Sequence, residues 1–313
     1  MSGNGQPAWC GGVADGFAWR GHQIACETVG DGPPVLLIHH PDLGASRAEW
    51  RALAPRLAAA GYRAIALDLL GFGQSDCPPI WYEADLYLEL LTDFRDAMIG
   101  EPCHLAGRGM GAAYAAVLAT AAPALHPSLT AINPFGIRPA EPQAEQYRQL
   151  AGSPAARAAY NAVTEAGELL RWLREEVYYA AEQVSAEVLA QVAQVAQRDN
   201  AEFPIAGQVA GLLYRDIRRE WVALEQPILL VWGEACEVPS LQDVDDYLMP
   251  LRPNAPFFVM DQRPVGIWKQ SVTYKCFPYT RQLPHVEASE GVASALLEHL
   301  GAAELDARLN GSS

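Results

Sequence analysis

The sequence predicts an α/β fold with a mainly parallel β-sheet and helices on both faces. Short apolar, β-branched runs alternate with segments of helical spacing along most of the chain, and glycines or turn residues end many of them. This alternation is typical of strands joined by helical crossovers, which makes neighbouring strands parallel. Half of the 313 residues are apolar, so the chain is long enough to bury one large core or a core plus a smaller module.

The first half of the chain supplies most of the predicted elements. A strand opens after the turn signal "GDGP", and the helix that follows it ends at Gly61. A second strand is stopped by glycines, and a second helix ends at Gly100. The next strand leads into an Ala-rich helix and then a further strand. These predicted elements span residues 33–40, 48–62, 63–73, 83–100, 102–107, 110–122 and 129–136.

The pattern changes after Pro139. From there to about residue 222 the chain is rich in Ala, Glu, Gln and Arg at helical spacing, without a convincing strand. Strands return in "PILLVWGE" and "APFFVMDQ", and "SEGVASALLEHLGAAE" closes the pattern with a helix. We therefore expect a helical cap over 137–224, inserted between the two parts of a core formed by 1–136 and 225–313.

Charge and cysteine content exclude several function classes. The formal net charge of −15 disfavours binding to nucleic acid or to an anionic membrane surface, because both need clustered Lys and Arg. The six cysteines are scattered, without the spacing of a zinc site, and are expected to be free thiols in a reducing compartment. The N-terminal "MSGNGQPAWCGGVADG" lacks the pattern of a signal peptide. We expect a cytoplasmic protein that spans no membrane and carries no metal or cofactor.

The order of motifs resembles the α/β-hydrolase fold superfamily. The resemblance is carried by "PPVLLIHHPDLGAS", "ALDLLGFGQSD", "LAGRGMGA", "PILLVWGE" and "LPHVEASEGVASALLEHL", over roughly 30–136 and 225–300. The wording is most similar to the cyanobacterial and plant branch with the pheophytinase-like proteins. Members use a nucleophile on a G-x-S-x-G turn, an acid, a histidine base and backbone N–H donors that bind an oxyanion.

Carried over position by position, the resemblance implies that these roles are vacant. The nucleophile falls on Gly109, which has no side chain, between the retained Gly107 and Gly111. The acid falls on Cys236. The base falls on Gln282, whose amide takes up no proton near neutral pH, and one oxyanion donor falls on Pro41, which has no N–H. Because such a triad works as a unit, we expect no ordinary hydrolysis of esters, amides, epoxides or haloalkanes.

Other residues near these positions are candidates to replace the missing groups. His40 or His285 could transfer a proton, although a structural hydrogen bond is the more usual role of a histidine at the position of His285. Arg108 could bind a carboxylate or phosphate, or could pair with a cap residue. Cys236 has no histidine next to it in the sequence, so a buried, unreactive thiol is the favoured interpretation. Glu234 and Glu237 flank Cys236 and could supply an acid, although carboxylates after a strand are ordinary, and Asn133 is not an acid. His39, His40 and His104 have no carboxylate or cysteine at metal-ligand spacing.

One segment stands out by composition. Lys269 and Lys275 are the only lysines of the protein, and they are interleaved with aromatic residues in 263–280. Aromatic anchors mixed with cations are typical of interfaces, so a loop here would contact a protein partner or a ligand, or would fold back and plug the pocket. The ligand or partner contacts predicted in all are Arg108, Met110, Trp268, Lys269, Tyr274 and Lys275.

These observations give two hypotheses of function. The first is a catalytically degenerate hydrolase fold that binds a protein or a hydrophobic small molecule; the resemblance implies a tetrapyrrole or an isoprenoid. The alternative is a non-hydrolytic enzyme of the lyase, isomerase or cyclase type, because a dry, shaped pocket lowers barriers by positioning alone. Arg108, His40 and His285 would serve that alternative.

Overall fold

The structure, a computed structural model, describes residues 8–139, 142–252, 257–259 and 272–310. Within these residues, nine strands form one sheet in the order β1-β2-β4-β3-β5-β6-β7-β9-β8. The pairs β1·β2 and β2·β4 are antiparallel, and all the other neighbours are parallel. The α/β-hydrolase fold with a mainly parallel sheet is therefore confirmed. The strands are β1 Val13–Trp19, β2 His22–Val29, β3 Pro34–Ile38, β4 Arg63–Leu67, β5 His104–Arg108, β6 Leu129–Ile132, β7 Ile228–Gly233, β8 Phe257–Val259 and β9 Val272–Phe277.

Helices cover both faces of the sheet, as the alternating pattern predicts. One face packs against α2, α3 and α9, and the other against η1, α1 and α12, which gives two large hydrophobic clusters. The predicted helix over 48–62 is divided at Leu53, where Pro55 supplies no backbone N–H. The helices of this core are η1 Arg47–Ala52, α1 Ala54–Ala59, α2 Ala84–Phe94, η2 Arg95–Ile99, α3 Met110–Ala121, η3 Pro123–Leu125, α10 Leu241–Asp243, η6 Val244–Leu248, η7 Met249–Leu251, α11 Pro284–Glu287 and α12 Ser289–Asn310.

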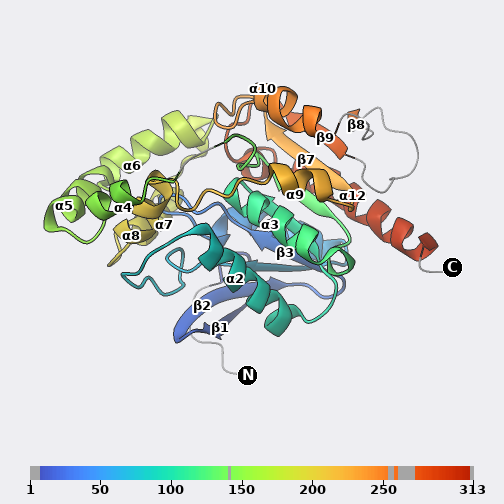
Figure 1. Cartoon of the computed structure of the whole chain (residues 1–313), viewed down its shortest axis with the longest axis horizontal. Helices are drawn as coiled ribbons and strands as arrows, with labels where there is room; N and C mark the ends of the chain where they lie inside the picture. The colour runs from blue at the N-terminus through green and yellow to red at the C-terminus, as the bar shows by residue number, and fades with distance from the viewer. Residues whose placement is uncertain (1–7, 140–141, 253–256, 260–271, 311–313) are drawn as a thin grey trace.

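Between β6 and β7 the described chain is helical, as predicted for the cap. Figure 1 shows α4 to α8 gathered at one end of the molecule, whereas α9 lies beside α3. Trp221 of α9 belongs to the main core cluster, so this last helix packs with the core. The exact boundaries of the cap stay a prediction. The helices are α4 Ala144–Leu150, α5 Pro154–Val163, α6 Ala166–Trp172, η4 Leu173–Val177, η5 Ala181–Gln183, α7 Ala186–Ala196, α8 Glu202–Val209 and α9 Arg218–Ala223.

Two parts of the sheet were not predicted. The hairpin of β1 and β2 turns on Arg20 and Gly21, both with positive φ (50° and 84°), a turn that twists with its strands. Strand β9 occupies residues that we expected to lie in a loop over 263–280, so that expectation is wrong for Val272–Phe277. Tyr274 packs against the main core cluster, and Lys275 pairs in register with Val231 of β7. Trp268 and Lys269 lie outside the described residues.

Close contact between β5 and α3 depends on glycine. A Cβ on Gly107 would lie 2.5 Å from the carbonyl carbon of Gly111, and a Cβ on Gly111 would lie 2.4 Å from the Ile38 oxygen. Real Cβ atoms do not approach backbone this closely. The two glycines therefore let the first turn of α3 rest directly on the ends of β3 and β5, which places the turn at Gly109.

Changing Gly111 to alanine is expected to destabilise the fold by about 2 kcal/mol, because overpacking against backbone forces the helix to move. Gly301 in α12 is the matched control, since a Cβ there meets nothing within 4 Å. Gly301→Ala is expected to stabilise the protein by about 0.5–1 kcal/mol through helix propensity. Urea unfolding of both variants measures the difference. Equal stability of the two variants would contradict the close approach.

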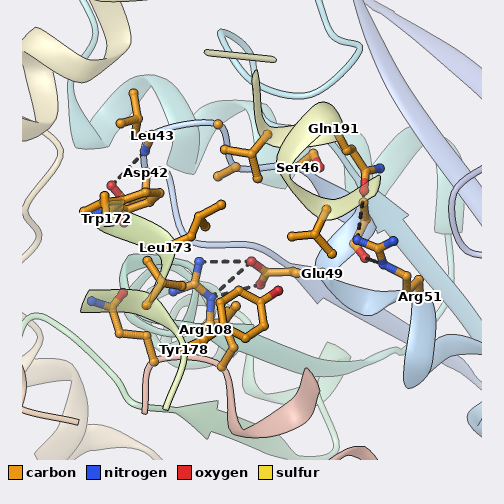
Figure 2. A pocket seen from close by; sticks show the side chains of 18 residues that line it. Asp42, Leu43, Ser46, Glu49, Arg51, Arg108, Trp172, Leu173, Tyr178 and Gln191 are labelled. Atoms are coloured by element: carbon orange, nitrogen blue, oxygen red, sulfur yellow. Dashed lines mark hydrogen bonds and ion pairs between the residues drawn. The ribbon is translucent and has the colours of Figure 1, made fainter. Parts of the chain in front are cut away.

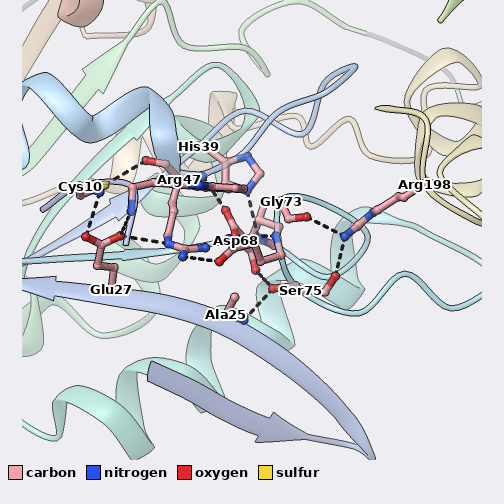
Figure 3. Close-up of polar contacts among 12 residues, drawn as sticks. Cys10, Ala25, Glu27, His39, Arg47, Asp68, Gly73, Ser75 and Arg198 are labelled. Carbon is pink, nitrogen blue, oxygen red and sulfur yellow. Dashed lines mark hydrogen bonds and ion pairs between the residues drawn. The ribbon is translucent and has the colours of Figure 1, made fainter. Parts of the chain in front are cut away.

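A buried ionic network joins the N-terminal segment to the core (Figure 3). The side chain of Arg47 is fully buried between the carboxylates of Glu27 and Asp68. Glu27 also accepts the backbone N–H groups of Trp9, Cys10 and Gly12 at 2.7–2.8 Å. Arg47 therefore holds two elements, β2 and the end of β4, against its own helix η1.

No helix of the described chain is long and apolar enough to cross a membrane.

Candidate functional site

The turn between β5 and α3 is the centre of the candidate site. Gly109 has φ 55° and ψ −120°, a conformation that glycine adopts without the strain a side chain would bring. Its N–H donates to the Ile132 oxygen at 2.9 Å, and its oxygen accepts from the Phe135 N–H at 3.1 Å. The sharp strand-to-helix turn is thus formed and held, although no side chain projects from its apex.

His40 fills the space above this turn. A Cβ built on Gly109 would lie 2.7 Å from His40 Nδ1 and 2.8 Å from its Cγ. The Met110 N–H, at the start of α3, donates to the same Nδ1 at 3.0 Å. The ring stacks on Phe135 with centroids 4.9 Å apart and planes at 19°. Burial and the charge of Arg108 hold the pKa of His40 well below its usual range, so the ring is neutral and accepts at Nδ1.

Met110 and His39 have structural roles. The Met110 side chain is buried in the main core cluster, and its N–H is taken by His40, so neither group reaches a ligand in this arrangement. His39 uses both ring nitrogens: Nδ1 lies 2.9 Å from the His40 oxygen, and Nε2 accepts the Leu69 N–H at 3.0 Å. Desolvation lowers the pKa of His39 to about 3, which fixes it as a neutral link between β3 and the end of β4.

Arg108 forms a buried, two-pronged ion pair with Glu49 of η1 (Figure 2). Its Nε lies 3.2 and 3.1 Å from the two carboxylate oxygens, and its Nη2 lies 3.0 Å from Oε2. Both side chains are more than nine-tenths buried. Of the two alternatives left open by the sequence, the pairing of Arg108 is thus made with a residue of the core and not of the cap, and binding of an anion stays a prediction. Burial raises the pKa of Glu49, and the nearby guanidinium opposes that shift.

His285 lies on the other side of Glu49. Its ring is fully buried, stacks on Trp50 with centroids 4.6 Å apart, and places Nε2 3.6 Å from Glu49 Oε1. Neither ring nitrogen has a hydrogen-bond partner among the described residues. The structural hydrogen bond that we expected for His285 is therefore not formed. Desolvation and the charge of Arg108 hold the pKa of His285 well below its usual range.

Gln282 and Cys236 have ordinary local contacts. The Gln282 amide donates to the Glu176 oxygen at 3.1 Å, so this side chain fastens the cap rather than facing the turn. The Cys236 thiol donates to the Val238 oxygen at 3.6 Å, and burial raises the pKa of this thiol to about 11, which keeps it protonated. Asn133 ties three chain segments together: its oxygen accepts the Gly233 N–H at 2.9 Å, and its amide donates to the oxygens of Arg281 and Gln282.

A cavity of about 70 Å³ lies between the cap and the ion pair. Arg108, Glu49, Arg51 and Asp42 form its charged part, and most of the remaining wall is apolar. Gly109 and His40 do not line it. The apolar wall is contributed mainly by Leu43, Trp172, Leu173, Val177, Val188, Val192 and Leu283.

The cap is fastened over this cavity. Arg198 donates to the oxygens of Gly73 and Ser75, each at 2.7 Å, and Arg51 donates to Gln191 at 2.8 Å. The Gln208 amide donates to Asp42 at 3.0 Å. These contacts tie the helical segment between β6 and β7 to loops of the core beside the cavity.

Sequence reasoning missed Glu49, which decides the state of Arg108. The available signal was a lone acid immediately before Trp50 in an amphipathic segment, but only the fold brings it into contact with Arg108, which lies 59 positions later in the sequence. Pro41, which directly follows the two histidines, has no N–H to donate. The described residues contain no group of three or more His, Cys, Asp or Glu that could hold a metal ion.

Two curated relatives are similar to limited parts of the chain. A 2-hydroxy-6-oxo-6-(2'-aminophenyl)hexa-2,4-dienoic acid hydrolase of Metapseudomonas resinovorans is 43% identical over 87 residues, 27% of this chain and 30% of the relative. A pimeloyl-[acyl-carrier protein] methyl ester esterase of Aeromonas hydrophila is 35% identical over 108 residues, 34% of this chain and 40% of the relative. The chain thus spans less than half the length of these relatives.

Solved structures match over almost the whole chain. The serine hydrolase CarC, involved in carbazole degradation, has a TM-score of 0.70 at 22% identity, with 93% of this chain and 99% of that chain covered. A meta-cleavage product hydrolase of Pseudomonas fluorescens IP01 has a TM-score of 0.70 at 18% identity, covering 92% and 97%. At these identities the likeness shows the fold. The profile of the alpha/beta hydrolase family matches residues 35–295, and the chain belongs to this family.

Proposed function

We propose that this chain is a pseudo-hydrolase, a family member that binds a small apolar molecule under its cap without hydrolysing it. The observation that carries the proposal is the position of His40, whose ring occupies the space that a side chain at Gly109 would need. The same ring accepts the Met110 N–H, a donor that an oxyanion would otherwise use. The site would thus lack a nucleophile, and the ring of His40 would fill the space where the nucleophile's side chain would lie.

The residues at the other catalytic positions support the same reading. Gln282 is bonded to a cap carbonyl, and Cys236 is a protonated thiol bonded to a neighbouring carbonyl. Because a triad acts as a unit, the joint substitution of nucleophile, acid and base leaves no path through a covalent intermediate. The named curated relatives are hydrolases, so the proposal separates this chain from them in activity while keeping their fold.

Cavity size favours a small ligand. A volume of about 70 Å³ is below the several hundred Å³ of pockets for drug-sized molecules, so neither a tetrapyrrole nor an isoprenoid fits while the cap is closed. A protein partner at 263–280 remains a prediction, because its anchors Trp268 and Lys269 lie outside the described residues. The cavity itself makes a small molecule the better candidate.

One observation favours a second candidate function, a non-hydrolytic enzyme of the lyase, isomerase or cyclase type. His285 is buried beside Glu49, and within the described part of the chain neither of its ring nitrogens has a hydrogen-bond partner; a proton-transfer group needs such a free nitrogen. This candidate requires that replacing His285, His40 or Arg108 with alanine abolish an activity found with a defined substrate. If all three variants turned over such a substrate at the rate of the wild type, this candidate function would be contradicted, because none of its proposed catalytic residues would be needed.

The pseudo-hydrolase proposal is tested with p-nitrophenyl acetate and butyrate. The wild type is expected to release p-nitrophenol no faster than heat-denatured protein. Gly109→Ser is expected to add no activity, because its Cβ meets His40 and because Gln282 cannot deprotonate the serine. A variant that combines Gly109→Ser, His40→Gly, Pro41→Phe, Cys236→Asp and Gln282→His has the groups for hydrolysis, and its version with Ala at 109 is the matched control.

Saturable hydrolysis by the wild type, lost on replacing His40, His285 or Cys236, would overturn the proposal. Activity of Gly109→Ser alone would also contradict it, because a base would then already be in place. Stability of each variant is checked by thermal unfolding, so that a misfolded protein is not counted as an inactive one.

A further inference from the structure

The ion pair at the end of the cavity has a third, unsatisfied member. Arg108 and Glu49 neutralise each other, and His285 lies 3.6 Å from Glu49 Oε1 with no hydrogen-bond partner for either nitrogen among the described residues. A fully buried polar group without a partner is uncommon and calls for an explanation. A small movement would shorten this 3.6 Å separation to a hydrogen bond. Glu49 therefore has a second possible partner, the imidazole of His285, on the side opposite Arg108.

We propose that the cavity binds a small aliphatic monocarboxylate, which takes the place of Glu49 on Arg108 while the imidazole of His285 takes up one proton. The inference rests on the proposed function and narrows it, because the ligand that binds without hydrolysis then has an apolar tail and a carboxylate head instead of being wholly apolar. A carboxylate is the anion that matches the fork of Arg108, and Glu49 occupies that fork as an internal substitute in the unliganded protein.

Charge balance explains why the proton is needed. In the unliganded site Arg108 is positive, Glu49 is negative and His285 is neutral, so the sum is zero. A carboxylate ligand adds one negative charge, which would be costly in a buried site. One proton from solvent on His285 Nε2 restores the zero sum, and Glu49 turns from Arg108 to the imidazolium. No covalent bond other than this N–H bond forms or breaks.

Among the described residues, few charged groups lie near His285. Glu49 comes from η1 and Arg108 from the end of β5, and both line the cavity with Arg51 and Asp42. Glu287 of the same short helix α11 is occupied by the N–H groups of Tyr179, Ala180 and Arg281. Strand β7, which packs on α11, carries no titratable side chain. The exchange therefore involves Glu49, Arg108 and His285, with Asp42, Arg51 and the phenol of Tyr178 lining the cavity that the ligand enters.

The remaining wall sets the kind of carboxylate. Apolar residues of the cap and core, among them Leu173, Val188 and Leu283, face the charged end of the cavity. At roughly 10–15 Å³ for each water-sized site, about 70 Å³ holds about five to seven water-sized groups. Butyrate has that size and combines an apolar tail with a carboxylate, so it is the probe.

Isothermal titration calorimetry of the full chain with butyrate tests the inference, in two buffers of different ionisation enthalpy at pH 6 and pH 8. We expect binding with uptake of close to one proton, and a dissociation constant that falls about tenfold for each unit that pH is lowered. Butyramide, which has the same shape without the charge, is expected to bind at least tenfold more weakly. Binding of butyrate without proton uptake, or equal binding of butyramide, overturns the inference.

Two variants test which side chain takes up the proton and which one competes with the ligand for Arg108. His285→Phe keeps the stacking on Trp50 and is expected to lose most of the proton uptake and at least tenfold in affinity at pH 6. Glu49→Gln removes the internal competitor and is expected to bind butyrate more tightly than the wild type, with little dependence on pH. Full uptake by His285→Phe would show that the proton goes to the ligand or to Glu49, and would overturn the role of the imidazole.

The two proposals fail separately. Absence of butyrate binding together with absence of ester hydrolysis contradicts the carboxylate inference and leaves the pseudo-hydrolase proposal standing. Ester hydrolysis by the wild type contradicts the pseudo-hydrolase proposal whatever the calorimetry gives. A tryptophan fluorescence titration with butyrate is an independent readout, because Trp172 lines the cavity and Trp50 stacks on His285.

Discussion

Arg47→Met is expected to destabilise the protein by about 3–5 kcal/mol, because removing one member of a buried ionic network leaves charges without a partner. Arg47 is fully buried between Glu27 and Asp68, and it also donates to Gln74 at 2.7 Å. The guanidinium carbon of Arg47 lies 4.8 Å from the centre of the Trp9 ring, and this contact would be lost as well. Urea unfolding at pH 7 measures the change.

The pH dependence of this effect has a defined sign. Burial already raises the pKa of Asp68, against the opposing effect of Arg47. Without Arg47 the pKa of Asp68 rises further, and a carboxyl with a raised folded-state pKa costs stability as pH increases through that pKa. The destabilisation of Arg47→Met is therefore expected to be larger at pH 8 than at pH 5.

Arg20→Met is the matched control for the same change of side chain. Arg20 pairs with Glu89 at 2.7 Å, but both side chains are more than half exposed, and exposed pairs contribute little. The control is expected to stay within about 0.5 kcal/mol of the wild type. A loss in Arg20→Met as large as that in Arg47→Met would contradict the assignment of stability to the buried network.

Arg108→Met is expected to lower the free energy of unfolding by about 3 kcal/mol, because Glu49 would remain buried without its partner. The pKa of Glu49, raised by burial, would rise further once the guanidinium is gone. The loss is thus expected to shrink as pH falls from 8 to 5, since protonated Glu49 is tolerated in an apolar site.

The double variant Arg108→Met/Glu49→Leu completes a cycle. Replacing both members of a buried ion pair with apolar side chains is often close to neutral, so the double variant is expected to be more stable than Arg108→Met alone. Thermal and urea unfolding of the wild type, both single variants and the double variant give the coupling energy. Additive losses, with the double variant the least stable, would show that the pair is not coupled.

Local sequence patterns predicted most of the sheet correctly. Apolar β-branched runs gave β3 to β8 at or near their observed positions, and glycines marked the end of α2 with η2 and the turn before α3. The hairpin of β1 and β2 was missed because β1 is largely exposed or half-buried and the turn is Arg20-Gly21 rather than a usual hairpin pair. Strand β9 was read as a loop because its mixed polar and aromatic composition resembles an interface.

The candidate site was predicted only in part. The sequence located the turn at Gly109 and singled out Arg108, His40 and His285, because motif spacing survives substitution. It could not show that His40 turns onto the Met110 N–H, since that contact spans 70 positions and needs the absence of a side chain at Gly109. Glu49 was missed for the same reason, as an ordinary acid in a helix becomes an arginine partner only through the fold.

The sequence by itself determined the fold class, the glycines that let α3 approach the strands, and the residues that stand at each motif position, because these depend on local periodicity and side-chain size. The tertiary structure decided which of those residues meet. It brought Glu49 between Arg108 and His285 and closed the cap over a small cavity. Burial then set the ionisation of these groups, because the energy of a charge depends on its surroundings in three dimensions and not on its neighbours in sequence.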